Sequence, residues 1–316
     1  MLSIFAIDPQ VCQNLEWFRY CVEHCHPSRG RAIADLPPGE WCRAALGVIE
    51  QGVRESRLGS VMGQSLKRRL DMARDRLVHR PGTVWDYMEP SWVRNVEQEH
   101  RRERFAAVVS PEYREADEAD RKYHPEKLDE SVTAWNTPSG IGIQRSPDAF
   151  ARAILPMLRV AKEIHFLDPH FKVDANSLFT RNYRQIIRDL TSQCEVFPMF
   201  TIHCCPDDDV KLTYFEGEFK RIYEELIPSG KSLTCVLWQV VGVPERGAHP
   251  FHNRFVLTDY CGVLVGYGTD SANAATEAPD TLQCLDQAIW HEKLTHSRKR
   301  THPMVTIRKE IKITGR

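Results

Sequence analysis

Hydrophobic residues in the first 110 positions recur every three to four residues, which is the spacing of amphipathic helices. Four segments carry this pattern, and the turn sequences PSRG, LPPG and HRPG separate them. The segments are residues 9–25, 39–56, 63–80 and 90–109. The pattern predicts a helical domain over residues 1–110. Residues 111–138 are densely charged with almost no hydrophobic period, which predicts a solvated linker or arm.

Residues 139–316 alternate between helical and strand patterns. Helices are predicted over residues 149–162, 176–193 and 214–230. Strands are predicted over residues 163–171, 194–204, 232–241, 254–259 and 262–266. Such alternation is typical of an α/β fold, in which helices flank a sheet. The prediction for the whole chain is a helical domain, a charged linker, and an α/β domain over residues 139–316.

The composition is that of a globular protein, with 42% hydrophobic and 27% charged residues in 316. The net charge of −1 shows no basic excess, so contact with nucleic acid needs a local basic patch. Three segments supply basic residues: 66–80, 100–105 and 296–302. The last of these, HSRKRTH, contains no acidic residue, and it is the best candidate for contacting a phosphate backbone.

Ten cysteines are spread along the chain. The N-terminal residues lack a signal-peptide pattern, and no hydrophobic run is long enough to cross a membrane. We therefore expect a cytoplasmic location, reduced thiols and no membrane contact. A group of Cys and His residues between 12 and 42 raises the possibility of zinc, but its spacing matches no standard zinc finger. Buried thiols are the favoured interpretation, and we expect neither a metal nor a cofactor.

The segment FHNRFVLTDYCGVLVGYGTDSA, residues 251–272, is the strongest candidate for a catalytic site. Alternate residues of a strand point to the same face, so His252 and Arg254 are expected to project together. Cleaving a phosphodiester needs a nucleophile, an acid for the leaving oxygen, and a cation for the non-bridging oxygens. A histidine can serve as nucleophile or acid, and an arginine binds phosphate through its planar fork.

This segment resembles the phospholipase D signature H-x-K-x4-D-x6-G-S-x-N. His252, Asp259 and Gly266 are in register with it, and EIHFLDPHF looks like the first strand of that fold. Arg254 replaces the lysine, the G-S-x-N element is GYGT, and Ser271 with its following Asn273 comes four residues late. The chain therefore resembles a divergent branch, similar to phospholipase D-like proteins of bacterial antiviral defence. The resemblance covers roughly residues 140–316 and implies a mixed sheet flanked by helices.

The resemblance also implies roles for individual residues. His252 is the nucleophile or acid, Arg254 clamps the phosphate and Asp259 supports the site. The loop after the next strand completes the pocket with Gly266, Gly268, Thr269, Asp270, Ser271 and Asn273. The resemblance further implies an acidic residue that orients the histidine, at Asp280 or Asp286. Asp286 is the preferred candidate, and we expect it to lie in an apolar strand. Asp168, at the end of the first strand, is a turn residue or a further supporting residue.

Only one full motif is present, and the resemblance implies that two histidines act together. His170-Phe171-Lys172 is a second H-x-K, but no aspartate follows it at the required spacing. We therefore expect a homodimer that brings two copies of His252 together. The implied activity is a metal-independent phosphodiesterase, a nuclease that forms a phosphohistidine. The alternatives are a phospholipase D-like binding or scaffolding module without catalysis and a zinc-bearing DNA-binding protein. The N-terminal domain is expected to bind a partner protein, regulate or support dimerisation.

Overall fold

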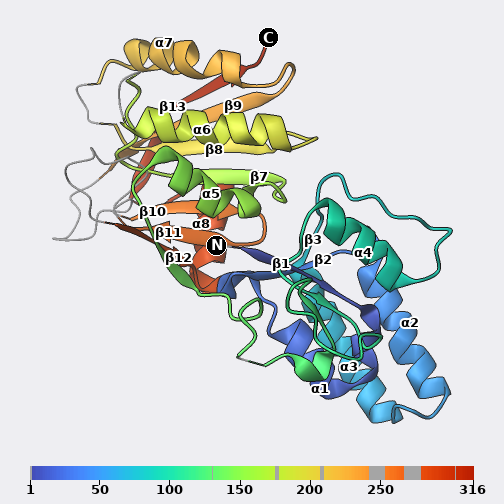
Figure 1. Ribbon diagram of the computed structural model, residues 1–316. Helices are drawn as coiled ribbons and strands as arrows, with labels where there is room; N and C mark the ends of the chain where they lie inside the picture. The colour runs from blue at the N-terminus through green and yellow to red at the C-terminus, as the bar shows by residue number, and fades with distance from the viewer. Residues whose placement is uncertain are drawn as a thin grey trace. The chain divides into compact units, whose positions relative to one another are not determined.

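The computed structural model describes residues 2–129, 131–174, 178–206, 210–241, 253–266, 279–302 and 304–316. The chain divides into two compact units, Leu2–Pro138 and Ser139–Arg316 (Figure 1). The second unit starts at the residue where the predicted α/β domain starts. Each unit contains its own β-sheet, so the chain is α/β throughout.

The N-terminal unit contains a five-stranded sheet whose paired strands are all parallel, in the order β3-β2-β1-β4-β5. Its strands are β1 (Ser3–Ile7), β2 (Arg31–Ala34), β3 (Leu77–Val78), β4 (Val108–Val109) and β5 (Lys122–Tyr123). Its helices are α1 (Leu15–Trp17), α2 (Trp41–Arg54), α3 (Ser60–Ala73) and α4 (Trp92–Arg102). The sequence patterns predicted α2 to within two residues at each end, but the segments predicted for α3 and α4 run seven residues past these helices and include β3 and β4.

The expectation of a purely helical N-terminal domain is therefore wrong. The strands are only two to five residues long, and their sequences, such as IFAI and RAIA, are almost continuously apolar. A parallel strand covered on both faces does not alternate between apolar and polar residues. In so short a run, periodicity does not distinguish a strand from part of a helix.

Residues 111–138 are not a detached linker. β5 pairs with β4 at the edge of the sheet, with Val109 opposite Tyr123. Four large side chains from this segment are buried in the N-terminal core: Tyr123, Leu128, Val132 and Trp135. The charged residues between them lie at the surface, and their number obscured the few apolar positions that anchor the segment.

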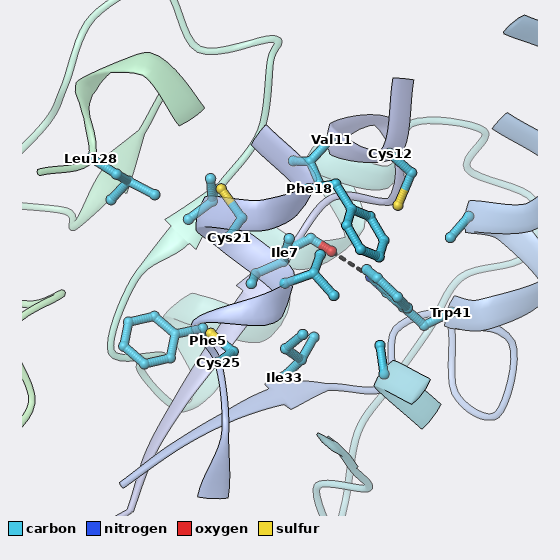
Figure 2. Close-up of a cluster of buried hydrophobic side chains, with 14 of the residues drawn as sticks. Phe5, Ile7, Val11, Cys12, Phe18, Cys21, Cys25, Ile33, Trp41 and Leu128 are labelled. Atoms are coloured by element: carbon cyan, nitrogen blue, oxygen red, sulfur yellow. Dashed lines mark hydrogen bonds between the residues drawn. The ribbon is translucent and has the colours of Figure 1, made fainter. Parts of the chain in front are cut away.

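The N-terminal core also explains the cysteines. Cys12, Cys21 and Cys25 are fully buried among Phe5, Ile7, Phe18 and Trp41, and the Trp41 indole donates a hydrogen bond to the Ile7 carbonyl at 2.5 Å (Figure 2). Burial raises the pKa of each of these three thiols, for Cys25 to about 12. Metal ligation requires the thiolate form. Among the described residues, no group of three or more Cys, His, Asp or Glu is arranged to hold a metal ion.

The C-terminal unit contains an eight-stranded mixed sheet in the order β13-β9-β8-β7-β10-β11-β12-β6. Three central strands are parallel: β7 (Glu163–Leu167), β8 (Met199–Cys204) and β9 (Ser232–Val240). The others pair antiparallel: β6 (Gly140–Ile143), β10 (Arg254–Thr258), β11 (Gly262–Val265), β12 (Asp280–Cys284) and β13 (Val305–Thr314). The predicted mixed sheet of this domain is confirmed.

Helices pack on both faces of this sheet. They are α5 (Pro147–Leu158), α6 (Leu178–Gln193), α7 (Leu212–Tyr223) and α8 (Gln287–Lys299). Phe166 of β7 faces α6, where its ring contacts that of Tyr183. Its neighbour Leu167 points to the opposite face and clusters with Leu294 of α8, as the alternation of a strand requires. Among the described residues, no helix combines the length and apolar character needed to cross a membrane.

Candidate active site

The candidate site lies where β7 ends and β10 begins. β10 runs antiparallel to β7, with Phe255 opposite Leu167, so the next residue of each strand brings Arg254 opposite Asp168. The Nε atom of Arg254 lies 3.5 Å from Oδ1 of Asp168. Because β7, β8 and β9 are parallel, this pair occupies the edge of the sheet at which their carboxyl ends meet. Ligands of α/β sheets bind outside this edge.

Asp168 and Arg254 differ sharply in exposure. The Asp168 side chain is 0% exposed, whereas that of Arg254 is 18% exposed. The Asp168 Oδ1 atom accepts a hydrogen bond from the His170 backbone N–H at 3.1 Å, and its own N–H donates to the His203 carbonyl at 2.9 Å. A buried carboxylate held in this way fixes the guanidinium beside it. Because Asp168 pairs with Nε of Arg254, the two Nη atoms are the ones suited to bind a phosphate.

Gly266 and Asp280 meet close to this edge. Gly266 follows β11, and its N–H donates to the Thr281 carbonyl at 3.0 Å. A Cβ at position 266 would lie 2.9 Å from the Asp280 carboxylate, so only glycine fits without displacement. Asp280 is buried and begins β12, and its carboxylate accepts a hydrogen bond from the Thr281 N–H at 2.6 Å. Of the two acids considered for this role, Asp280 is the one buried at the sheet.

The expectation that Asp286 lies in an apolar strand is wrong. Asp286 precedes α8, where its carboxylate accepts a hydrogen bond from the Ala288 N–H at 2.8 Å and caps the helix. This contact is solvent-exposed. The strand predicted around it ends at Cys284, two residues earlier. An aspartate directly before a helical run is a capping signal, and that signal was available in the sequence.

The structure does not bring Asp259 to Arg254. They lie at opposite ends of β10, roughly 16 Å apart at the usual rise of about 3.3 Å per residue. The Asp259 carboxylate accepts a hydrogen bond from the Lys162 N–H at 3.0 Å, just before β7. Burial raises the pKa of Asp259, while the bonds from the Lys162 and Glu163 backbone lower it. Asp259 thus fastens the turn after β10 to the start of β7.

Six of the predicted site residues lie outside the described part of the chain: His252, Gly268, Thr269, Asp270, Ser271 and Asn273. His252 precedes Arg254 by two residues in the sequence. The second H-x-K, in contrast, is described. Its His170 and Lys172 are exposed just after β7, at the same sheet edge as Arg254, and Phe171 between them is buried.

No family model matches this chain, and no curated protein matches it. The geometry around Arg254 and the motif resemblance are therefore the two sources from which its function can be inferred. What the geometry offers is a partly exposed guanidinium, paired with a fully buried carboxylate, at the edge of the sheet where the carboxyl ends of the parallel strands meet.

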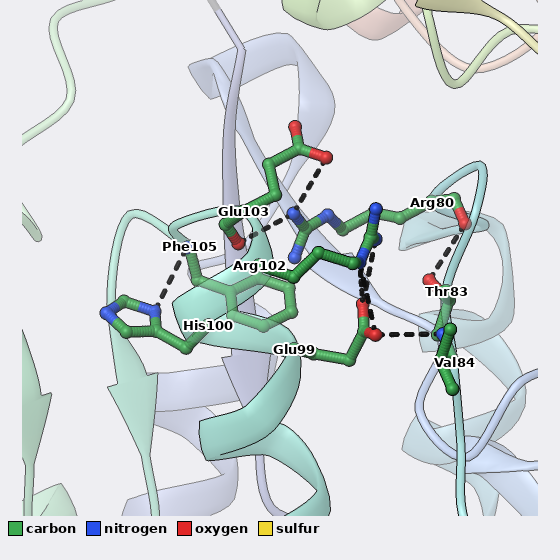
Figure 3. Close-up of polar contacts among 8 residues, drawn as sticks. All are labelled: Arg80, Thr83, Val84, Glu99, His100, Arg102, Glu103 and Phe105. Carbon is green, nitrogen blue, oxygen red and sulfur yellow. Dashed lines mark hydrogen bonds and ion pairs between the residues drawn. The ribbon is translucent and has the colours of Figure 1, made fainter.

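Several cations of the basic segments are paired with acidic side chains within the described residues. In the segment 296–302, Arg298 pairs with Glu163 and Arg300 pairs with Glu310. Arg102 donates to the buried Glu99 at 2.8 Å in the N-terminal unit (Figure 3). These pairs leave less positive charge at the surface than the sequence suggested.

Figure 3 shows that the cluster around Glu99 is an internal network. Glu99 also accepts a hydrogen bond from the Val84 N–H at 2.8 Å, and buried Arg80 donates to the Glu103 carbonyl at 2.8 Å. The Arg80 guanidinium lies 4.0 Å from the centre of the Phe105 ring. These contacts hold the segment after β3 against α4, which is a structural role.

Proposed function

We propose that this chain is a phosphodiesterase of the phospholipase D type that acts on nucleic acid. The observation that carries the proposal is the position of Arg254. Its guanidinium is held at the carboxyl edge of the parallel strands by buried Asp168, two residues after His252 in the sequence. A histidine nucleophile and a cation for the non-bridging oxygens are the two groups that phosphodiester cleavage needs first.

In the proposed reaction, the His252 imidazole attacks phosphorus and displaces one oxygen of the diester. A second imidazole donates a proton to that leaving oxygen and then takes one from the water that hydrolyses the phosphohistidine. Arg254 binds the non-bridging oxygens, whose negative charge grows in the transition state. Asp168 is a positioning residue, because it acts on the substrate only through Arg254.

The test is cleavage of labelled single-stranded and double-stranded DNA and RNA in the presence of EDTA. We expect His252→Ala to lower the rate at least about a hundredfold, the contribution of a general acid or base. His291→Ala is the matched control, because His291 is an exposed histidine on α8 and its loss should leave the rate unchanged. Activity that His252→Ala does not change would contradict the proposal.

Two substitutions at position 254 test the phosphate clamp in the same assay. We expect Arg254→Ala to lower kcat/KM by about tenfold to a hundredfold, since a charge-assisted hydrogen bond contributes about 1.5–3 kcal/mol. Arg254→Lys restores the lysine of the family motif and keeps the charge, so it should retain more activity than the alanine variant. Equal activity in both variants would show that the charge is not used.

The second candidate function is a binding or scaffolding module without catalysis. The Asp168–Arg254 ion pair favours it, because the carboxylate offsets part of the charge that would attract phosphate. Under this alternative, the parent protein cleaves no phosphodiester but still binds nucleic acid. Arg254→Ala would then weaken binding, and His252→Ala would not.

A further inference from the structure

The sheet face that packs against α8 carries a row of buried polar side chains that the proposed site does not use. The row begins at Trp238 of β9 and crosses His203 of β8, then His165 and Glu163 of β7. It ends at Arg298 of α8, whose side chain is half exposed. Trp238 Nε1 lies 3.2 Å from His203 Nδ1, and His203 Nε2 lies 3.0 Å from His165 Nδ1. His165 Nε2 lies 3.8 Å from the Glu163 carboxylate, which in turn pairs with Arg298.

The Trp238 indole at one end of the row determines which ring nitrogen donates and which accepts in the two hydrogen bonds between the rings. Trp238 Nε1–H only donates, so His203 Nδ1 must accept. A neutral His203 then carries its proton on Nε2 and donates it to His165 Nδ1. A neutral His165 accordingly carries its proton on Nε2, which faces the Glu163 carboxylate. The tautomers of both histidines therefore follow from one donor and one acceptor.

This arrangement has no place for an additional proton. His203 is 1% exposed and His165 is 5% exposed, so water does not solvate a charge on either ring. A proton added at His203 Nδ1 would face the Trp238 N–H, and one added at His165 Nδ1 would face the His203 N–H. Burial and the neighbouring His165 lower the pKa of His203 well below its usual value.

The charged groups near the pair do not remove this conflict. Glu163 of β7 faces His165 and is already paired with Arg298 of α8. The nearby His165 and Arg298 lower the pKa of Glu163, although burial raises it. Arg300, which follows α8, opposes a positive charge on His203.

α8 depends on the far end of this row. Only Leu294 and Ser297 are buried among its residues, and its amino-terminal half is held by Trp290, which donates to the Thr258 carbonyl at 3.0 Å. Near its carboxyl end, Arg298 reaches the sheet through Glu163. A helix with so little buried surface is sensitive to the loss of one anchoring pair.

We propose that the row from Trp238 to Arg298 is an acid-sensitive latch that holds the carboxyl-terminal part of α8 on the sheet. The arrangement of donors and acceptors in the row requires both imidazoles to be neutral. Uptake of a proton by the histidine pair breaks the row, turns His165 and Glu163 away from their present positions, and releases Arg298 with its helix. The latch does not depend on the proposed catalytic function.

The test is amide hydrogen exchange of the full chain between about pH 8 and about pH 5, corrected for the intrinsic pH dependence of exchange. Below about pH 6.5, the ordinary pKa of histidine, we expect the protection of α8 to fall about tenfold per pH unit for one proton taken up. If two protons are taken up, the protection of α8 should fall about a hundredfold per pH unit. Protection of α2, in the N-terminal unit, should not change in step with that of α8.

Three variants assign the effect to the row. The double variant His165→Gln and His203→Gln has no titrating ring there, so α8 should lose its acid response. His291→Gln removes an exposed histidine of α8 and should leave the response unchanged. If the double variant does not fold, Trp238→Phe still decides the matter: it lets His203 Nδ1 take a proton without facing an N–H, so the acid response of α8 should weaken.

Several results would overturn the latch. One is protection of α8 that does not vary between about pH 8 and about pH 5. Another is an acid response of α8 that persists unchanged in the double variant, or one that is undiminished in Trp238→Phe. His296 and His302 form a second ring pair near the end of α8, 5.3 Å apart. If His296→Gln with His302→Gln abolishes the response instead, that pair is the sensor and the proposed row is not.

Discussion

Asp8 shows how one buried carboxyl makes the N-terminal unit sensitive to pH. It follows β1 and bridges to β4, because its carboxylate accepts hydrogen bonds from the Ser110 hydroxyl at 2.6 Å and the Gln10 N–H at 2.8 Å. Burial raises its pKa from 3.8 to about 6, although both of these bonds lower it. The folded state therefore holds this proton more tightly than the unfolded state does.

The sign of the stability effect follows from this difference. Between about pH 4 and about pH 6 the folded state binds more protons, so the free energy of unfolding falls as the pH rises, and it levels off above about pH 6. The whole effect is about 3 kcal/mol. We expect Asp8→Asn to remove this slope and to raise the free energy of unfolding at neutral pH by about 1–3 kcal/mol. Chemical denaturation across this pH range measures both quantities.

Ser110→Ala is the control for the Asp8 prediction, because it removes the bridging hydroxyl and leaves the carboxyl. That bond lowers the pKa of Asp8, so its loss should steepen the dependence on pH. A wild-type stability that does not change over the same range would contradict the raised pKa.

At the residue scale, the sequence identified Arg254 but not its partner. Alternation within RFVLT is a local property, so the start of β10 was accessible from the sequence. The pairing with Asp168 depends on the register between two strands far apart in the chain, which local patterns do not encode. The same limit explains Asp259. The motif groups it with Arg254, but Asp259 lies just beyond the opposite end of β10.

At the element scale, α8 begins at Asp286, whose side chain caps the helix. We expect Asp286→Ala to lower the free energy of unfolding by about 1 kcal/mol, the usual contribution of an N-cap side chain. Asp286→Asn, the matched control, keeps the capping oxygen and should cost little. Neither variant should change the proposed nuclease activity, because the carboxylate lies on the exposed end of a helix. If both variants lost activity while their stability stayed unchanged, Asp286 would be a residue of the active site.

The success of prediction differed between elements for a physical reason. Helices α6 and α7, with their long apolar faces, and strands β7 to β9, with continuous apolar runs, were predicted close to their observed positions. β13 was missed although VTIRKEIKIT has alternating apolar positions, because four charged residues dominate its composition. Its pairing along nearly the whole of β9 supplies the stability that its sequence conceals.

At the scale of the whole molecule, the proposed mechanism needs two imidazoles, and the motif at His252 supplies one per chain. The second comes from another copy of His252 in a homodimer or from His170 of the same chain. His170 is the described alternative, since it is exposed at the sheet edge and its N–H donates to the Asp168 carboxylate. These two arrangements predict different effects of dilution and of His170→Ala on the specific activity.

We expect the homodimer, because no aspartate follows His170 at the spacing of the motif. Light scattering should give the mass of two chains, and specific activity should fall on dilution as the dimer dissociates. His170→Ala should keep its activity within a few-fold, while His252→Ala loses it. A fully active monomer inactivated by His170→Ala would place both histidines in one chain. That outcome would leave the reaction as proposed and remove the need for a two-fold axis, since the edge holding Arg254 would then contain the complete acid–nucleophile pair.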